Sequence, residues 1–158
     1  MKTLLQAGAA VQRSLEQSGW HFCFIGGVAN FRWGAPRLTD DLGLTLLTGF
    51  GEEPRFVAAL LDGFESRIPD AAGFAATNRV VLLRTPDGFG LDVALGAMPF
   101  EARTITRSSL AELVPGAVLR TCSAEDLVVH KAFAARPQDW ADIEGVAGAE
   151  KVVGQFPH

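Results

Sequence analysis

An alternating segment places carboxylate chemistry on one face of an expected strand. Over residues 41–46, leucines alternate with Asp41, Gly43 and Thr45. Because successive side chains of a strand point to opposite faces, Asp41 and position 43 share the face opposite the leucines. Carboxylates at positions i and i+2 of a strand can hold a pair of divalent cations, which clamp the attacking and leaving oxygens in phosphoryl or nucleotidyl transfer. The pattern therefore points to metal-assisted transfer, with Gly at the second of the two positions.

A second carboxylate interrupts another apolar run. Asp92 lies between Leu91 and Val93 in a segment that favours a strand. Burying a carboxylate in such a run is costly unless the group is ion-paired or bound to a metal. The residues alone leave two alternatives, a solvent-facing position on an edge strand or a further metal ligand beside Asp41.

A glycine pair ends the apolar run Phe22–Ile25, which has the length and composition of a buried strand. Gly26 and Gly27 allow a sharp turn and let a phosphate approach the amides at the start of the following helix. A tight strand-to-helix turn without any ligand is the alternative that such a pair also allows.

The elements that must position these residues follow from periodicity and from turn signals. We expect a sheet built from short strands, with helices packed against it, and a hairpin whose turn is Pro86-Asp87-Gly88. The expected helices are 2–18, 28–34, 52–64 and one that begins at Ser123; the expected strands are 22–25, 41–46, 79–84, 89–95 and short strands within 103–121; residues 68–76 are expected to form a loop.

Composition limits the class of protein. A chain of 158 residues with 48% hydrophobic and 20% charged residues is expected to form one soluble domain. A net charge of −4 argues against a broad nucleic-acid-binding surface. The chain contains no apolar run long enough to span a membrane and no signal-peptide pattern at its start, so we expect a cytoplasmic protein. The isolated Cys23 and Cys122 are expected to be structural thiols.

The motifs around these residues carry a resemblance to a known family. The chain resembles nucleotidyltransferases of the DNA polymerase beta superfamily, and in particular the bacterial branch of AbiEii/AbiGii-type toxins. The likeness is strongest over residues 20–145. It rests on Gly26, Gly27, Trp33, Gly34, Pro36, Arg37, Thr39 and Asp41 in that order, on Asp92 ahead of Pro99-Phe100-Glu101, and on Lys131, Arg136, Asp139 and Asp142.

The resemblance implies a fold and a set of roles. The fold would be α/β (α+β), a nucleotidyltransferase fold with a small mixed β-sheet flanked by helices, in a single domain spanning 1–158. Asp41 and Asp92 would bind Mg²⁺ or Mn²⁺, and Gly26 and Gly27 would cradle the nucleotide phosphates. Lys131 would steady the triphosphate, while Arg37 and Thr39 would shape the metal loop and border the nucleotide.

The implied function is metal-dependent transfer of a nucleoside monophosphate from a nucleoside triphosphate to an RNA, protein or small-molecule acceptor. Many family members act in toxin–antitoxin or phage-defence systems, so a cognate toxin or antitoxin is an expected partner. Gly43 stands where the family has its second aspartate, and the loss of that ligand weakens metal binding or abolishes transfer. The alternative function is a catalytically inactive binding or regulatory module with the same fold.

Three explanations of Gly43 stay open from sequence. The chain is a degenerate member, or the glycine is an introduced substitution, or another oxygen ligand completes the site. Asp40 is a poor replacement because strand alternation points it away from the face of Asp41.

Overall fold

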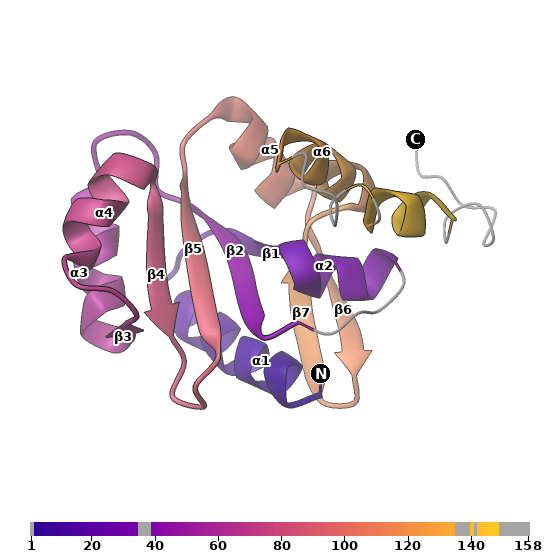
Figure 1. Ribbon diagram of the computed structural model, residues 1–158, viewed down its shortest axis with the longest axis horizontal. Helices are drawn as coiled ribbons and strands as arrows, with labels where there is room; N and C mark the ends of the chain where they lie inside the picture. Colours follow the sequence, from indigo (N-terminus) through magenta and orange to yellow (C-terminus); the bar gives the residue numbers. More distant parts are fainter. Residues whose placement is uncertain (1, 35–38, 135–139, 141, 149–158) are drawn as a thin grey trace.

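A computed structural model describes residues 2–34, 39–134, 140 and 142–148. Helices and strands follow one another in an irregular order along the chain. The strands form one central sheet, and the helices pack around it (Figure 1). The elements are α1 (Lys2–Gln17), β1 (Phe22–Ile25), α2 (Gly26–Trp33), β2 (Asp41–Leu47), α3 (Glu53–Gly63), β3 (Glu65–Ser66), α4 (Ala71–Asn78), β4 (Val80–Arg84), β5 (Gly90–Gly96), α5 (Pro99–Thr106), β6 (Ser109–Val114), β7 (Ala117–Thr121) and α6 (Ala124–Ala134).

The sheet is mixed, as expected from the sequence. Its strand order is β3-β4-β5-β2-β1-β7-β6. Strands β2 and β5 run parallel in the middle, and β1 and β7 form a second parallel pair. The other neighbours are antiparallel, including the expected β4–β5 hairpin. Placing β2 beside β5 is the step that brings two distant segments of the chain together.

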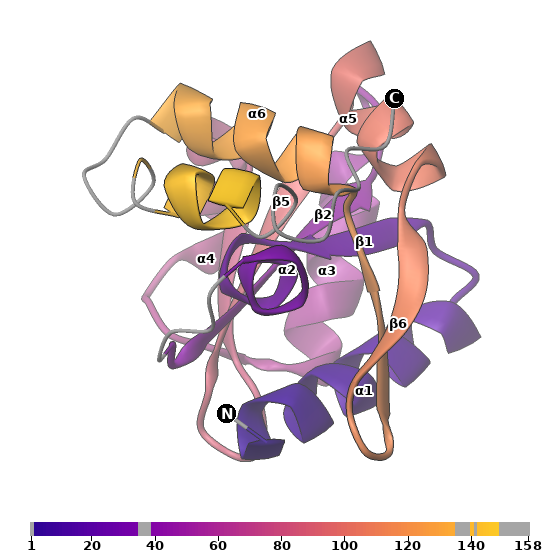
Figure 2. The same ribbon diagram turned by 90° about the vertical axis from the view of Figure 1, so that its right-hand side faces the viewer.

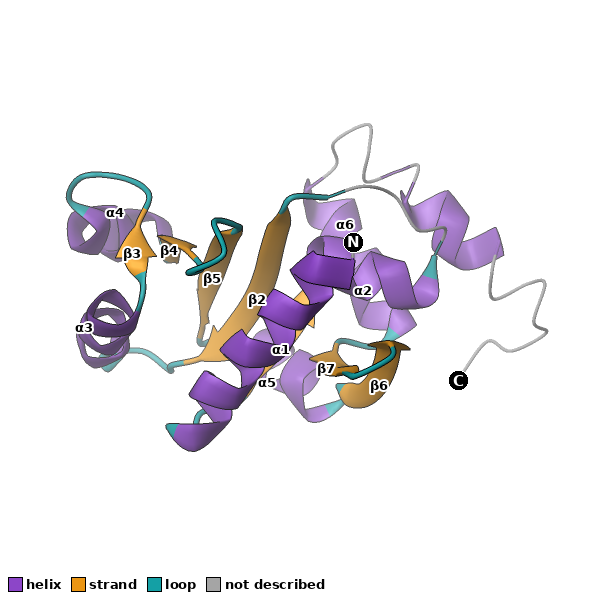
Figure 3. Cartoon of the chain, turned by 90° about the horizontal axis from the view of Figure 1, so that it is seen from below, coloured by secondary structure: helices purple, strands orange, loops and turns teal. Residues whose placement is uncertain are grey.

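Side-chain alternation divides the interior into two layers. The leucines of β2 and the apolar residues of β5 face α1 and α3, and together these strands and helices build the larger core. The opposite face packs against α5 and α6 in a smaller cluster (Figures 2 and 3). No helix in the described part of the chain is long and apolar enough to cross a membrane. The larger core includes Leu4, Leu15, Phe24, Leu42, Leu44, Phe56, Leu60, Leu91 and Val93, and the smaller includes Cys23, Ile105, Cys122 and Leu127.

Both cysteines are fully buried in the smaller cluster and are not joined by a disulfide. Burial raises the pKa of the Cys23 thiol to about 12 and raises that of Cys122 as well. Because the thiolate is the reactive form, thiols with raised pKa values are poor nucleophiles. Their environment fits the structural role predicted for them.

The prediction of a loop over residues 68–76 is wrong, because α4 occupies much of that segment. Asp70 caps the helix by accepting a hydrogen bond from the Gly73 amide at 3.2 Å. The helix spans only eight residues and has no amphipathic stripe in its Ala- and Gly-rich sequence. Helices this short depend on tertiary packing, which here buries Ala71 and Ala75.

The prediction of short strands across 103–121 is wrong for its first part. Helix α5 extends to Thr106, and only β6 and β7 are strands. Pro99 at the start of α5 has a backbone angle suited to a first helical turn, and Glu101 Oε1 accepts from the Met98 amide at 3.0 Å. Those capping residues are visible in the sequence and outweigh the β-branched Thr104 and Ile105.

Candidate functional site

The site lies where β2 and β5 begin, on the face opposite the leucines. In the parallel register Asp41 is opposite Gly90, and Gly43 is opposite Asp92. Strands β2 and β5 are neighbours in the sheet (Figure 1). Asp41 and Asp92 therefore come from segments far apart in the chain and lie on the same face of two adjacent strands. Their side chains are 62% and 44% exposed, so both carboxylates are open to a ligand from solvent.

Arg67 joins the two carboxylates. It follows the short strand β3, and its guanidinium donates through Nη2 to Asp92 Oδ1 in a short hydrogen bond. Nη1 of the same group lies 3.9 Å from Asp41 Oδ1. The Arg67 side chain is only 21% exposed, much less than either partner. One cation thus stands between two anions at the candidate site.

Sequence reasoning missed Arg67 because nothing in its neighbourhood marks it. It belongs to no motif and follows a strand of two residues. A faint signal is Gly90 at the start of β5: a Cβ there would collide with Arg67 Nη1 and Asp41 Oδ1. The glycine leaves room for the ion pair, but that reason is visible only once the strands are placed.

The glycine pair lies next to this face. Ile25 is paired with Gly43, so α2 begins at Gly26 beside the start of β2. Gly26 has φ +60°, a conformation that favours glycine, and the N-cap residue Ile25 makes no side-chain hydrogen bond to the helix. The first amides of α2 therefore donate no hydrogen bond to the N-cap side chain, which favours anion binding at this helix start.

Thr39 closes the loop that leads into β2. Its Oγ1 lies 3.4 Å from the backbone nitrogen of Asp41. A Cβ on Gly27 would approach the Thr39 side chain to 3.0 Å, so the second glycine allows Thr39 to pack closely on α2. Arg37, predicted to act beside Thr39, lies outside the described residues.

Gly43 leaves an open position between these groups. An added Cβ would meet only Ile25 Cγ1 at 3.9 Å, an ordinary contact, and the residue does not have positive φ. Among the described residues no three His, Cys, Asp or Glu side chains cluster as a metal site. Two carboxylates do fit one Mg²⁺, which proteins commonly bind through one or two carboxylates together with substrate phosphates. They do not supply the ligands for a pair of metals.

Lys131 is in a buried ion pair. Its Nζ lies 2.7 Å from Asp142 Oδ2, and the two side chains are 6% and 5% exposed. The structure thus brings together the two residues that the sequence places eleven positions apart. Arg136 and Asp139 lie outside the described residues. The role of Lys131 at a triphosphate stays a prediction.

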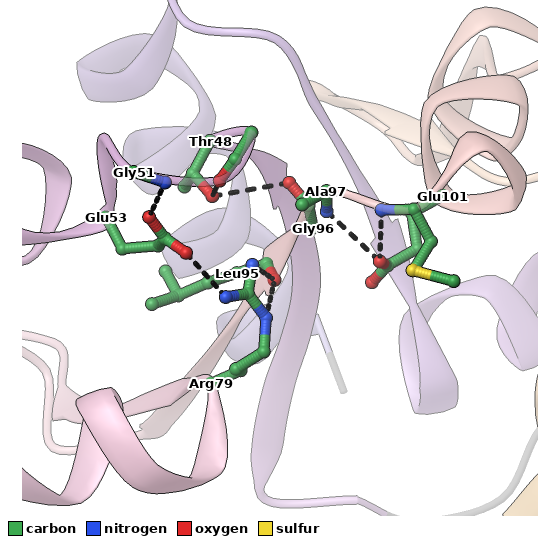
Figure 4. Close-up of polar contacts among 10 residues, drawn as sticks. Thr48, Gly51, Glu53, Arg79, Leu95, Gly96, Ala97 and Glu101 are labelled. Atoms are coloured by element: carbon green, nitrogen blue, oxygen red, sulfur yellow. Dashed lines mark hydrogen bonds and ion pairs between the residues drawn. The ribbon is translucent and has the colours of Figure 1, made fainter.

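The opposite end of β5 has a separate pocket of about 640 Å³ between α3 and α4. Its walls are mainly apolar, and an ion pair between Glu53 and Arg79 borders it (Figure 4). Arg79 Nη2 also donates to the Leu95 carbonyl at 2.8 Å, while Glu53 accepts from the Gly51 amide at 2.5 Å. Asp41 and Asp92 are not among its lining residues, so it is distinct from the carboxylate face.

No protein-family model and no curated protein sequence matches the chain. Solved structures do. An antigenic nucleotidyltransferase-like protein from Paracoccidioides brasiliensis has a TM-score of 0.63 at 15% identity, over 94% of this chain and 76% of its own. The antibiotic-resistance factor ANT(2'')-Ia, in complex with adenylyl-2''-tobramycin, has a TM-score of 0.60 at 20% identity, over 96% of this chain and 90% of its own.

A third similar structure is the lincosamide antibiotic adenylyltransferase LnuA, solved with lincomycin bound. Its TM-score is 0.60 at 11% identity, over 90% of this chain and 95% of its own. Together these likenesses, spread over nearly the whole chain, show that the protein has the nucleotidyltransferase fold. The expectation of a mixed sheet flanked by helices in that fold is confirmed.

Proposed function

We propose that the chain transfers a nucleoside monophosphate from a nucleoside triphosphate to an acceptor, at the face shared by β2 and β5. The observation that carries the proposal is the convergence of Asp41 and Asp92 beside the uncapped start of α2. This places anionic oxygen ligands next to the first backbone amides of α2, a pairing suited to a metal–triphosphate complex. The fold shared with adenylyltransferases supports the same reaction class.

The chain's own residues would divide the work as follows. Asp41 and Asp92 would hold one Mg²⁺ or Mn²⁺, which when bound neutralises triphosphate charge. The amides at Gly26 and Gly27 would hold phosphate oxygens. An acceptor hydroxyl would attack the α-phosphorus and lose its proton to solvent water. The bond from that phosphorus to the bridging oxygen would break, and pyrophosphate would leave. Gly43 supplies no carboxylate for a second metal, so we expect slow transfer.

We propose that the acceptor is a small molecule, an RNA or a protein hydroxyl. LnuA and ANT(2'')-Ia were solved with lincomycin and with adenylyl-2''-tobramycin, which favours small-molecule acceptors for trial first. The ordered motifs from Gly26 to Asp41 support the AbiEii-like branch, whose members act in toxin–antitoxin or phage-defence systems. RNA and protein hydroxyls are the further candidate acceptors, and a cognate toxin or antitoxin is the candidate partner.

A second candidate is a binding or regulatory module that does not transfer nucleotides. The observation that favours it is the loss of a carboxylate at Gly43 together with the pairing of Arg67 to both remaining aspartates. Such a module would keep the fold and the helix start while leaving the metal ligands incomplete. The two candidates differ in whether an aspartate at position 43 is needed for any turnover.

The test compares the chain with its Gly43→Asp variant in the transfer of α-labelled nucleotide, with Mg²⁺ or Mn²⁺. Acceptors are an aminoglycoside, a lincosamide, bulk RNA and cell lysate. Because the position is open, the variant is expected to fold and to transfer at least about 100-fold faster than the unmodified chain. Gly43→Asn is the matched control, since it adds nearly the same volume without a charge.

The outcomes separate the candidates. Labelling by both proteins, lost in Asp41→Asn and Asp92→Asn, supports transfer by the chain as it stands. Labelling by the Gly43→Asp variant alone supports the non-transferring module on an otherwise complete scaffold. Absence of labelling and of nucleotide binding by both proteins would rule out the proposed transfer.

A further inference from the structure

Arg67 has a charge and a position that bear directly on cation binding. The site holds two carboxylates and one guanidinium. Arg67, which directly follows β3, contacts both carboxylates. We propose that Arg67 is the resting counter-ion of this site, occupying the place of a divalent cation, and that a metal binds only when the guanidinium moves away. This inference rests on the proposed metal site at Asp41 and Asp92.

The contacts are those expected of a substitute cation. A guanidinium has five N–H donors in a planar fork, which suits it to carboxylate oxygens on two sides. In this site the fork reaches Asp92 through Nη2 and Asp41 through Nη1. Without that charge, two like charges would lie diagonally across adjacent strands, an unfavourable arrangement. Gly43 adds no third carboxylate to the pair. Among the described residues, the Arg67 guanidinium is the group that bridges Asp41 and Asp92.

The guanidinium can leave without disturbing the sheet. Arg67 is held in place by its main chain, whose amide donates to the Leu82 carbonyl at 3.0 Å. Its contact to Asp41 is long at 3.9 Å, and both carboxylates are well exposed to solvent. Rotation of one side chain would therefore free two oxygens while β3 and β4 stay paired. The cost of metal binding then includes breaking the ion pair to Asp92.

The test measures Mn²⁺ binding without nucleotide, by the loss of the free Mn²⁺ signal in electron paramagnetic resonance. Arg67→Gln removes the competing charge, so its Mn²⁺ affinity is expected to be at least about tenfold higher than that of the unmodified chain. A second readout is thermal unfolding. The melting temperature of Arg67→Gln should fall without metal and rise more than that of the unmodified chain when Mn²⁺ is added.

Arg84→Gln is the matched control. Arg84 is exposed on the neighbouring strand β4 and, within the described part of the chain, forms no ion pair with Asp41 or Asp92. Its loss removes the same charge, so an equal gain in affinity would overturn the specific role of Arg67. Arg67→Gln/Asp92→Asn should lose the gained affinity. A Mn²⁺ affinity for Arg67→Gln within twofold of the unmodified chain would also overturn the proposal.

If Arg67→Gln fails to fold, Arg67→Lys decides the question. Lysine keeps the charge but loses the planar fork, so its hold on two carboxylates is weaker. We expect about a threefold gain in Mn²⁺ affinity for this variant, and no gain would contradict the proposal. Because nucleotide is absent throughout, the Mn²⁺ titrations do not depend on the transfer assay. Arg67 can compete with Mn²⁺ in a chain that transfers no nucleotide, and a chain that transfers nucleotide can show no such competition.

Discussion

An arginine paired with acidic side chains lies beside each end of β5, and the two ion pairs differ in their surroundings. At the start of the strand Arg67 joins Asp41 and Asp92, whose side chains are 62% and 44% exposed. At the far end Arg79 pairs with Glu53 at 2.6 Å, and the Glu53 side chain is 20% exposed. Both ends pair an arginine with carboxylates, so we compare what surrounds each ion pair.

Backbone groups anchor the ion pair at the far end. Arg79 donates to the Leu95 carbonyl from both Nε and Nη2, and Glu53 also accepts from the Gly51 amide (Figure 4). Breaking that pair would leave backbone partners unsatisfied, which is costly when they are shielded from water. The Asp41–Arg67–Asp92 group has no described backbone partner of that kind on its guanidinium. An ion pair surrounded by backbone donors and acceptors is structural, whereas one facing solvent can be exchanged for a ligand.

The largest expected loss of stability comes from the buried ion pair between Lys131 and Asp142, which serves as a reference for the two ion pairs beside β5. Lys131→Met leaves Asp142 charged and buried, so the free energy of unfolding should fall by about 3–5 kcal/mol. Urea denaturation measures it. The double variant Lys131→Met/Asp142→Leu should regain most of the loss, and an unchanged stability of the single variant would show that the pair is not buried as described.

A matched pair of substitutions compares the two ends directly. Arg79→Met removes the donors to Leu95 and Glu53 and should lower the free energy of unfolding by about 1–3 kcal/mol. Arg67→Met removes an ion pair with exposed partners and should cost less than about 1 kcal/mol. Urea denaturation of both variants gives the difference. A larger loss for Arg67→Met would reverse the distinction between a structural and an exchangeable end.

The loss of stability at acidic pH should depend on Glu53, the carboxylate paired with Arg79 at the far end of β5. The hydrogen bond from Arg79, followed by backbone amides, holds the pKa of Glu53 below its ordinary value of 4.5. A carboxyl whose pKa is lower in the folded state contributes stability above its unfolded pKa and loses it as pH falls through the folded pKa. Thermal melts below pH 4.5 should therefore fall less steeply for Glu53→Gln than for the unmodified chain. Equal slopes would argue against the pair.

The smallest expected effect is at Asp40. The residue is exposed and precedes β2, outside the register that aligns Asp41 with Gly90. Asp40→Asn should leave Mn²⁺ affinity within about twofold, since exposed charges are screened by solvent, whereas Asp41→Asn should abolish the Mn²⁺ affinity gained in Arg67→Gln. The same resonance titration measures both, and a comparable loss in Asp40→Asn would mean that this carboxylate does reach the site.

Much of the fold was predictable because local patterns agreed with the final packing. The leucine alternation of β2, the β4–β5 hairpin turn and the Ser123 start of α6 all kept their predicted form. Helix α4 was not predictable, since its Ala-rich sequence has no apolar stripe and its stability comes from neighbours. Helix α5 was missed although its capping residues were present, because β-branched residues beside it favoured strand.

The site was predictable only in part for the same reason. Asp41, position 43 and Asp92 could be assigned to one kind of chemistry from strand alternation and from motif order, and the structure places them on one face. Arg67 was missed, and the burial of Lys131 against Asp142 was not foreseen. Both depend on which elements lie next to each other, which no local pattern records.

The sequence by itself determined which residues could share a strand face, since a period of two residues is a property of the extended chain. It also determined that position 43 has no carboxylate. The tertiary structure alone decided that β5 lies parallel to β2, so that Asp92 is opposite Gly43, and that the chain after β3 delivers Arg67 between two carboxylates. Long-range strand pairing and the ion pairs between strands depend on the packing of the whole sheet. That packing places the Arg67 guanidinium between Asp41 and Asp92.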